Sequence, residues 1–142
     1  MLKGISKIIS PELLKILCEM GHGDEIVIAD GNFPAENYGK RVVRADGIAG
    51  VEMLKAVLSL IPLDTYASEN FMLMQTVEGD PKPSIWGEYF EVASKLDDNL
   101  KKGYLERFAF YERAKEAYAV IATGEGAVYA NIIIKKGVIC IV

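Results

Sequence analysis

The sequence GHGDEIVIADGNFP, residues 21–34, predicts one short strand with polar residues at both ends. Residues 25–29 are apolar after Glu25, as is typical of a strand that is buried within an α/β sheet. His22 is the only histidine of the chain and precedes this strand, whereas Asp30 follows it. Ligands of open α/β sheets bind beyond the carboxyl ends of the strands, so the position of Asp30 favours a polar ligand.

His22 and Asp30 are expected at opposite ends of this strand. A strand of about seven residues, at roughly 3.3 Å each, separates them within one subunit. If both side chains act on one ligand, then either the strand is shorter than the pattern indicates or a second subunit completes the site.

The rest of the chain alternates between helical and extended patterns. Four helices are expected. The first covers residues 10–20, and the second begins at a cap at Asp46 and stops at Pro62. The third covers 85–96, in a unit that ends at Gly103, and the fourth lies within 106–117. Extended segments are expected at 41–44, 71–77, 118–122, 130–134 and 138–142, with a loop at 31–40. This order predicts an α/β fold: a single three-layer domain over residues 1–142, with a mostly parallel sheet covered by helices on both faces.

Composition excludes several classes of partner. The net charge is −4 over 142 residues, and no run of basic residues indicates binding to nucleic acid or to an anionic membrane. No segment reaches the roughly 18 apolar residues that span a bilayer, so a cytoplasmic protein is expected. The apolar content of 51% and the apolar ending VICIV favour a homo-oligomer. Cys18 and Cys140 are expected to be buried thiols.

Familiar cofactor and metal motifs do not fit. The glycines at 21 and 23 precede a strand, whereas a dinucleotide fingerprint must follow one. The chain has no P-loop and no Gly-x-Ser-x-Gly elbow. The carboxylates of Asp24, Glu25 and Asp30 are not spaced like a known cation-binding loop, so solvated strand ends are the better interpretation and no metal site is predicted.

Five side chains together form a set that suits a polyhydroxylated ligand. Singly, each has a plain structural alternative: His22 as a helix cap, Asp30 in an Asx turn, Arg107 in an ion pair with Glu106 or Glu112, Tyr129 as a core ring, and Asn131 in a turn or strand-edge hydrogen bond. The five are His22, Asp30, Arg107, Tyr129 and Asn131. An imidazole, a carboxylate, a guanidinium, a phenol and an amide can bind hydroxyl groups and move their protons.

Five blocks in order resemble the L-fucose mutarotase and D-ribose pyranase family. They are GHGDE at 21–25, DGNFP at 30–34, RADG at 44–47, ERFAFYERA at 106–114, and TGE at 123–125 followed by YANII at 129–133. Arg107 and its surroundings resemble the fucose branch, because the ribose branch typically has a histidine at that place and a threonine in place of Gly23. Gly31 departs from the alanine that is common after the aspartate.

The resemblance implies an enzyme that interconverts the anomers of a free monosaccharide, L-fucose in this branch, without a cofactor. It also implies a ring-shaped homo-oligomer, often a decamer, with sites at subunit interfaces. His22 would be the proton donor. The side chains and backbone that would contact the sugar belong to Asp30, Arg107, Tyr129, Ala130 and Asn131. Two alternatives stay open at this point: a D-ribose pyranase-type ring isomerase and a non-catalytic monosaccharide-binding module.

Overall fold

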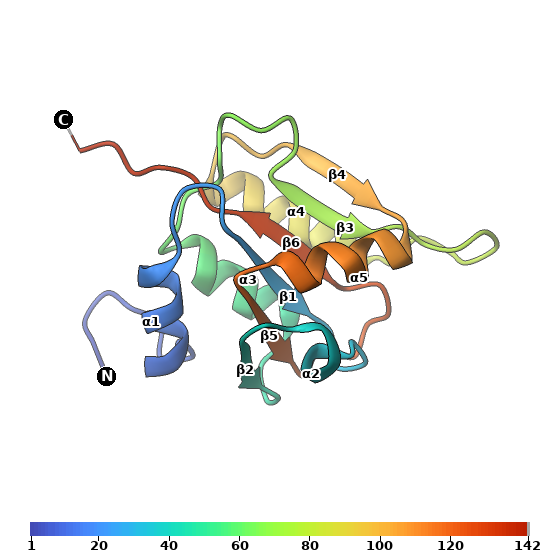
Figure 1. Ribbon diagram of the computed structural model, residues 1–142, viewed down its shortest axis with the longest axis horizontal. Coiled ribbons are helices and arrows are strands. Elements are labelled where there is room, and N and C mark those ends of the chain that lie inside the picture. The colour runs from blue at the N-terminus through green and yellow to red at the C-terminus, as the bar shows by residue number, and fades with distance from the viewer. Residues whose placement is uncertain (142) are drawn as a thin grey trace.

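The computed structural model describes residues 1–141 as one sheet with helices packed against it (Figure 1). The strands are β1 (Glu25–Ala29), β2 (Val42–Ala45), β3 (Phe71–Met74), β4 (Lys102–Leu105), β5 (Ala119–Thr123) and β6 (Ile132–Lys135). The helices are α1 (Pro11–Glu19), α2 (Ala35–Tyr38), α3 (Gly50–Leu58), α4 (Ile85–Leu96) and α5 (Arg107–Glu116). Within residues 1–141, no helix combines the length and the hydrophobicity that crossing a bilayer requires.

The sheet is parallel except for one central strand. Its order is β2-β5-β1-β6-β3-β4, and only β6 runs antiparallel to its neighbours, β1 and β3. The α/β class and the mostly parallel sheet are therefore confirmed. Because β6 is reversed, the residues that precede it lie at the edge where the other strands end.

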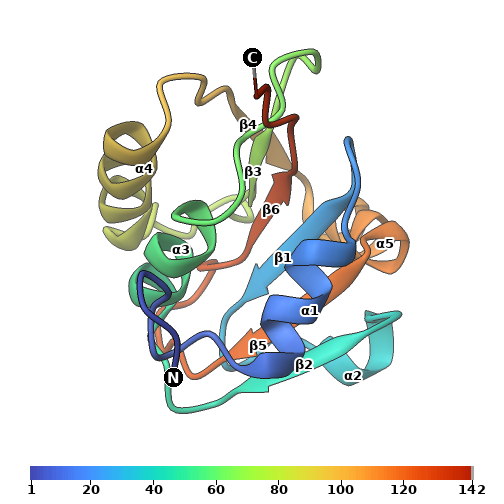
Figure 2. The same ribbon diagram turned by 90° about the vertical axis from the view of Figure 1, so that its left-hand side faces the viewer.

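Helices cover both faces of the sheet, as expected (Figure 2). α1, α3 and α4 pack on one face, against a core that includes Ile26, Ile28 and Ile121. α2 and α5 pack on the other face, against Val27, Val120 and Ile133. Adjacent residues of a strand point to opposite faces, and both faces are buried here, which explains the continuous apolar runs in the sequence.

Local contacts begin α1 and fix α5 in place. Ser10 caps α1 by accepting the backbone N–H of Leu13 at 3.1 Å. Glu106 caps α5 in the same way, and Arg113 of α5 forms a two-point ion pair with Glu25 at the start of β1, at 2.9 and 2.7 Å. α5 therefore runs back along the sheet from its beginning near the carboxyl ends of the parallel strands.

Several sequence expectations are wrong in detail. The loop at 31–40 contains the short helix α2, and Gly103 lies inside β4 because its backbone pairs with Met72 of β3. Asp46 does not cap α3, which begins after Ala49; its carboxylate pairs with Arg44. A tertiary partner overrides the local signal at Gly103, whereas the partner of Asp46 is local, two residues earlier in the chain.

The chain ends also differ from expectation. Cys18 and Cys140 are exposed, not buried, because the first lies on the outer side of α1 and the second in the terminal segment. Residues 138–141 form no strand, and residue 142 lies outside the described residues. This apolar segment projects from the molecule without a neighbouring strand to pair with (Figure 1).

The buried face of α3 offers a direct test of the core. Leu54 is fully buried, whereas the adjacent Lys55 is exposed. We expect Leu54→Ala to lower the free energy of unfolding by about 3 kcal/mol, because it removes buried apolar volume and leaves a cavity. Lys55→Ala is the matched control. Urea denaturation followed by circular dichroism measures both, and equal midpoints for the two variants would contradict this packing.

Candidate functional site

A cleft lies at the carboxyl edge of the sheet, where β1, β3 and β4 end and β6 begins. Its volume is about 310 Å³. The residues that line it are Asp30, Asn32, Phe33, Met74, Asp80, Arg107, Tyr111, Val128, Tyr129 and Asn131. The reversed strand explains this gathering, since it brings residues 129–131 beside the end of β1. Four of the side chains expected from the sequence therefore meet here.

Asp30 and Asn131 are joined by reciprocal hydrogen bonds. The backbone N–H of Asp30 donates to Asn131 Oδ1 at 2.7 Å, and Asn131 Nδ2 donates to Asp30 Oδ2 at 3.2 Å. The backbone N–H groups of Asn32 and Ala130 also donate to the Asp30 carboxylate, at 3.0 and 3.3 Å. Asp30 therefore makes an Asx-turn hydrogen bond, which was its structural alternative, and it also lines the cleft.

Burial dominates the electrostatics of Asp30. The residue is only 5% exposed, and desolvation raises the pKa of its carboxyl above the ordinary value. The hydrogen bonds from Asn32 and Ala130 act in the opposite direction without cancelling the effect of burial. A carboxyl whose pKa is raised, in a cleft, is typical of binding and catalytic sites.

Tyr129 adopts a backbone conformation that its surroundings hold in place. Its φ of 55° is unusual for a residue with a side chain. Trp86 Nε1 donates to the carbonyl of Tyr129 at 2.8 Å, and Tyr89 Oη donates to the carbonyl of Ala130 at 3.0 Å. The Tyr129 hydroxyl donates to Asp80, and this bond raises the pKa of the phenol. α4 therefore shapes the wall of the cleft from behind.

Arg107 faces the cleft at the start of α5. Among residues 1–141 it forms no ion pair, and the alternative of pairing with Glu106 or Glu112 is wrong: Glu106 caps α5 and Glu112 pairs with Lys115. Its guanidinium lies 4.8 Å from the centre of the Phe108 ring.

An aromatic wall stands beside this guanidinium. The ring centres of Phe33 and Tyr111 are 5.6 Å apart, and Tyr38 stacks on Tyr111 at 4.9 Å. The cleft thus combines hydrogen-bonding groups with a flat apolar surface, which suits a sugar with both hydroxyl and C–H faces.

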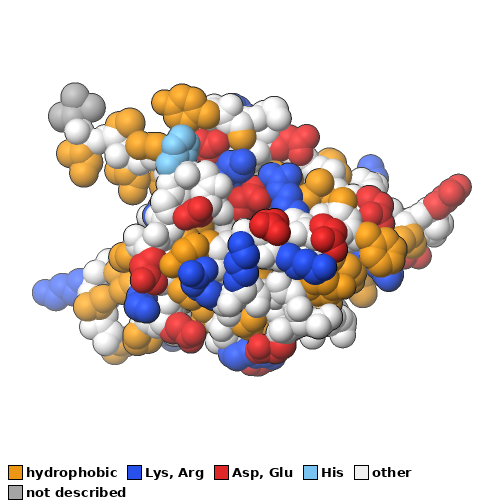
Figure 3. Space-filling model, viewed as in Figure 1, with side chains coloured by type: hydrophobic (Ala, Val, Ile, Leu, Met, Phe, Trp, Pro, Cys, Tyr) orange, Lys and Arg blue, Asp and Glu red, His pale blue; other side chains and the backbone are white. Residues whose placement is uncertain are grey.

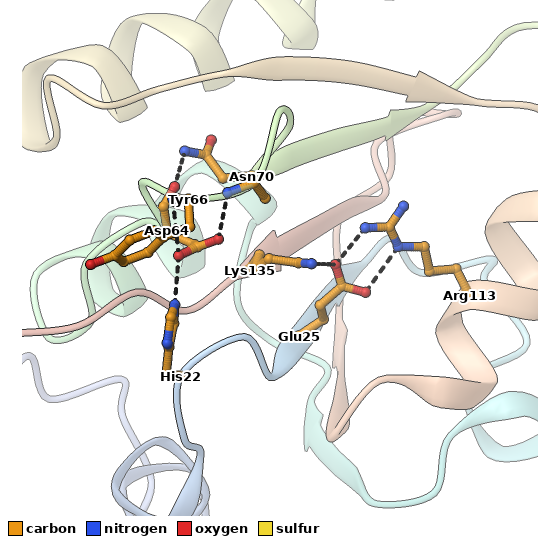
Figure 4. Close-up of polar contacts among 8 residues, drawn as sticks. His22, Glu25, Asp64, Tyr66, Asn70, Arg113 and Lys135 are labelled. Carbon is orange, nitrogen blue, oxygen red and sulfur yellow. Dashed lines mark hydrogen bonds and ion pairs between the residues drawn. The ribbon is translucent and has the colours of Figure 1, made fainter.

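His22 is not in the cleft. It lies at the amino edge of the sheet, where its Nε2 is 2.8 Å from Asp64 Oδ1 (Figure 4). Its side chain is 47% exposed and is visible as the single pale blue group of Figure 3. The ring does not cap the carbonyls of α1, because Lys136 Nζ donates to Leu17 and Met20 there. The cap reading of His22 is therefore wrong.

The five residues of β1 separate His22 from the cleft. At 3.3 Å per residue this strand alone spans about 17 Å, far more than a monosaccharide can bridge. The separation expected from the sequence is therefore real within one chain. The amino edge of the sheet carries His22, and the carboxyl edge carries the other four expected side chains.

Asp64 and Asp80 are polar residues that sequence reasoning missed. Asp80 lies in the segment EGDPKP, where an aspartate is ordinary turn chemistry, and Asp64 follows the apolar Leu63. Only their partners in space single them out: Tyr129 for Asp80 and His22 for Asp64. Over residues 1–141, no cluster of three His, Cys, Asp or Glu side chains could hold a metal ion.

The environment of Asp30 generates a test by titration. We expect its carboxyl to titrate above the ordinary value of 3.8, and that of Asp46, which Arg44 hydrogen-bonds, below it. Native Asp30 then keeps its proton to a higher pH than the unfolded chain does. As pH rises from 3.8 through the native pKa, this group lowers the stability of the native state. Carboxyl ¹³C NMR gives both midpoints, and an Asp30 midpoint at or below that of Asp46 would contradict the burial argument.

Comparison with known proteins places this geometry in a family. The family model described as the RbsD / FucU transport protein family matches residues 3–139. The chain is 52% identical over 140 residues to an L-fucose mutarotase of Histophilus somni (strain 2336), with 97% of each chain covered.

Solved structures agree with this assignment. The fucose mutarotase of Streptococcus pneumoniae in complex with L-fucose superposes with a TM-score of 0.94 at 49% identity, covering 98% of this chain and all of the other. Bacillus subtilis RbsD complexed with D-ribose superposes with a TM-score of 0.73 at 26% identity, covering 99% of this chain and all of the other. By its sequence over nearly its whole length and by its fold, the chain belongs to the RbsD / FucU family.

Proposed function

We propose that this protein is an L-fucose mutarotase, an isomerase that interconverts the α and β anomers of the free sugar. The observation that carries the proposal is the convergence of Asp30, Arg107, Tyr129 and Asn131 on one cleft of about 310 Å³. The same fold, at 49% identity, belongs to a fucose mutarotase that was crystallised with L-fucose.

The reaction needs only proton transfer. A base removes the proton of the anomeric hydroxyl, an acid protonates the ring oxygen, the bond between C1 and that oxygen breaks, and a carbonyl forms at C1. After rotation about the adjacent C–C bond, the same hydroxyl attacks the other face of the carbonyl and the protons return. No atom or electron is gained or lost. Free sugars mutarotate slowly in water, so positioned acid and base groups suffice.

The cleft residues are assigned to binding. Asp30 and Asn131, which hold each other, would accept and donate hydrogen bonds to neighbouring hydroxyls. Arg107 presents several N–H donors in a rigid plane, so it would orient two sugar oxygens at once. The phenol of Tyr129 completes the set on the β6 side of the cleft. Ala130, also expected from the sequence, is fully buried and does not line the cleft: its N–H donates to Asp30 and its carbonyl accepts from Tyr89. The rings of Phe33 and Tyr111 would cover a C–H face of the sugar.

His22 is assigned to proton transfer, from a second subunit. Histidine exchanges protons near neutral pH because its ordinary pKa is about 6.5. Within one chain β1 keeps His22 too far from the cleft, so His22 of one copy would approach the cleft of another. The exposed fraction of the ring, 47%, leaves it available for such a contact.

Exposed apolar side chains lie close to both parts of the site. Val138, Ile139 and Ile141 follow the segment that pairs with the His22 loop, and Phe108 and Val128 lie by the cleft. In Figure 3 the projecting terminal segment carries orange side chains beside the histidine. Such surfaces favour contact between copies of the chain. The ring-shaped decamer and the cytoplasmic location stay predictions.

The two alternatives are less well supported. The ribose-complexed relative is more distant, at 26% identity and a TM-score of 0.73, and the sequence around Arg107 resembles the fucose branch. A non-catalytic binding module would need no titratable group beyond the cleft. The geometry of His22, in contact with a buried carboxylate, favours catalysis.

Replacement of His22 tests the enzymatic proposal. Glutamine keeps a hydrogen-bonding side chain of similar reach but cannot carry a proton near neutral pH. We expect His22→Gln to retain L-fucose binding and to slow anomer exchange about 10²-fold or more. Saturation-transfer NMR between the two anomeric proton signals measures the exchange at matched sugar concentration and pH.

Lys15→Gln, on the exposed side of α1, serves as the control variant. The proposal fails if wild type exchanges the anomers no faster than buffer does. If His22→Gln exchanges them as fast as wild type, another group carries the proton. Faster exchange on D-ribose than on L-fucose would favour the pyranase alternative.

A further inference from the structure

Asp64 is a buried carboxylate that lies outside the cleft. Its side chain is 4% exposed. Oδ2 accepts the backbone N–H of Ala67 at 2.9 Å, and Oδ1 accepts that of Tyr66 at 3.3 Å while lying 2.8 Å from His22 Nε2. Burial raises the pKa of the Asp64 carboxyl, but hydrogen bonds from His22 and the two backbone groups outweigh burial and bring the pKa below its ordinary value. Asp64 is therefore ionised at neutral pH.

The backbone of Asp64 is held as firmly as its side chain. Its N–H donates to the carbonyl of Lys135 at the end of β6, at 3.0 Å. Its carbonyl accepts Nδ2 of the fully buried Asn70 at 2.8 Å. Asn70 also donates to the carbonyl of Asn99 at 2.7 Å and accepts the N–H of Lys101 at 2.8 Å. The carboxylate thus has a fixed position, tied to the end of β6 and, through Asn70, to the segment before β4. Figure 4 shows Asp64 between Asn70 and His22.

The loop that carries His22 is tied to the same strand. The N–H of Gly23 donates to the carbonyl of Lys136 at 2.9 Å, directly after β6. Gly23 has a φ of 86°, which a residue with a side chain rarely adopts, so the turn that aims His22 depends on glycine. The ring of the exposed Tyr66 lies 5.3 Å from that of His22. The imidazole held by this turn faces Asp64 with its Nε2, which lies 2.8 Å from Oδ1.

An ionised carboxylate can only accept hydrogen bonds. His22 Nε2 must therefore carry a hydrogen and donate it to Asp64, in the neutral ring as well as in the charged one. In the neutral ring the lone pair then lies on Nδ1.

We propose that Asp64 is a positioning residue for the reaction: it holds His22 as the Nε2–H tautomer and leaves Nδ1 as the atom that takes a proton from the sugar and returns it. This inference rests on the proposed function, because Nδ1 needs a substrate to act on. Without Asp64, neutral His22 divides between two tautomers and two ring orientations, and one tautomer presents N–H where a base is required.

The tautomer is measurable without any sugar. Uniform ¹⁵N labelling gives one pair of imidazole signals, because the chain has a single histidine. At about pH 8.5, well above the ordinary histidine pKa, we expect the Nδ1 signal in the range of an unprotonated ring nitrogen and the Nε2 signal in the range of an N–H nitrogen.

Asp64→Asn keeps the size of the side chain but has only one acceptor oxygen. If this oxygen serves Ala67, the amide NH₂ faces His22 and favours the opposite tautomer. We expect Nδ1–H signal to appear in this variant and kcat for anomer exchange to fall at least tenfold, with KM changed less than twofold because Asp64 does not touch the cleft. Asp97→Asn is the matched control, since Asp97 holds the N–H of Leu63, next to Asp64, without contacting His22.

Three results would overturn the proposal. One is a wild-type ring that is mainly the Nδ1–H tautomer, and this result stands even if Asp64→Asn does not fold. Another is an Asp64→Asn variant whose tautomer and kcat match those of Asp97→Asn. The third is a wild type that shows the expected tautomer but exchanges fucose no faster than buffer, which removes the proposed function and Asp64's role in it together.

Discussion

The hydrogen-bond ladder of β6 is the interaction on which the rest of the structure depends. This strand is fully buried from Ile132 to Ile134 and pairs antiparallel with β1 on one side and with β3 on the other. It joins two groups of parallel strands that would otherwise have no common edge. Along Ile132–Ile134 this ladder lies away from water, where an unpaired backbone group would be costly.

The direction of β6 also determines the chemistry at both edges of the sheet. Its beginning brings Asn131 to Asp30, where strands β1, β3 and β4 end, and so builds the cleft. Its end supplies the carbonyls of Lys135 and Lys136, which hold Asp64 and the turn before β1 that carries His22. One reversed strand thus sets the cleft, proposed to bind the sugar, at one edge and His22, proposed to transfer protons, at the other. Under the proposed function, a closed symmetric assembly of copies would let such edges meet.

The sequence predicted most of this fold because its strands and helices have clear local patterns. The apolar run at 25–29 and the helix at 85–96 have the bounds that the pattern indicated. Gly103 was misread because its pairing with β3 depends on a segment far away in the chain. Asp46 was misread because its carboxylate pairs with Arg44, two residues earlier, instead of capping α3. The cleft residues were predictable in type and partly in place. Asp64 was not, because a buried aspartate has no distinctive neighbours in sequence and is explained only by His22, 42 residues earlier.

The central claim is that His22 of one subunit serves the cleft of another, and mixing of subunits tests it most directly. His22→Gln and Asp30→Asn each damage one half of the site, and each variant alone should exchange the anomers of L-fucose poorly. When the two are dissociated, mixed in equal amounts and reassembled, sites that combine two intact halves should form, with exchange recovering toward about a quarter of the wild-type rate for random mixing in a symmetric assembly. If both halves came from one chain, the mixture would show only the average of the two variants, and that result would contradict the account.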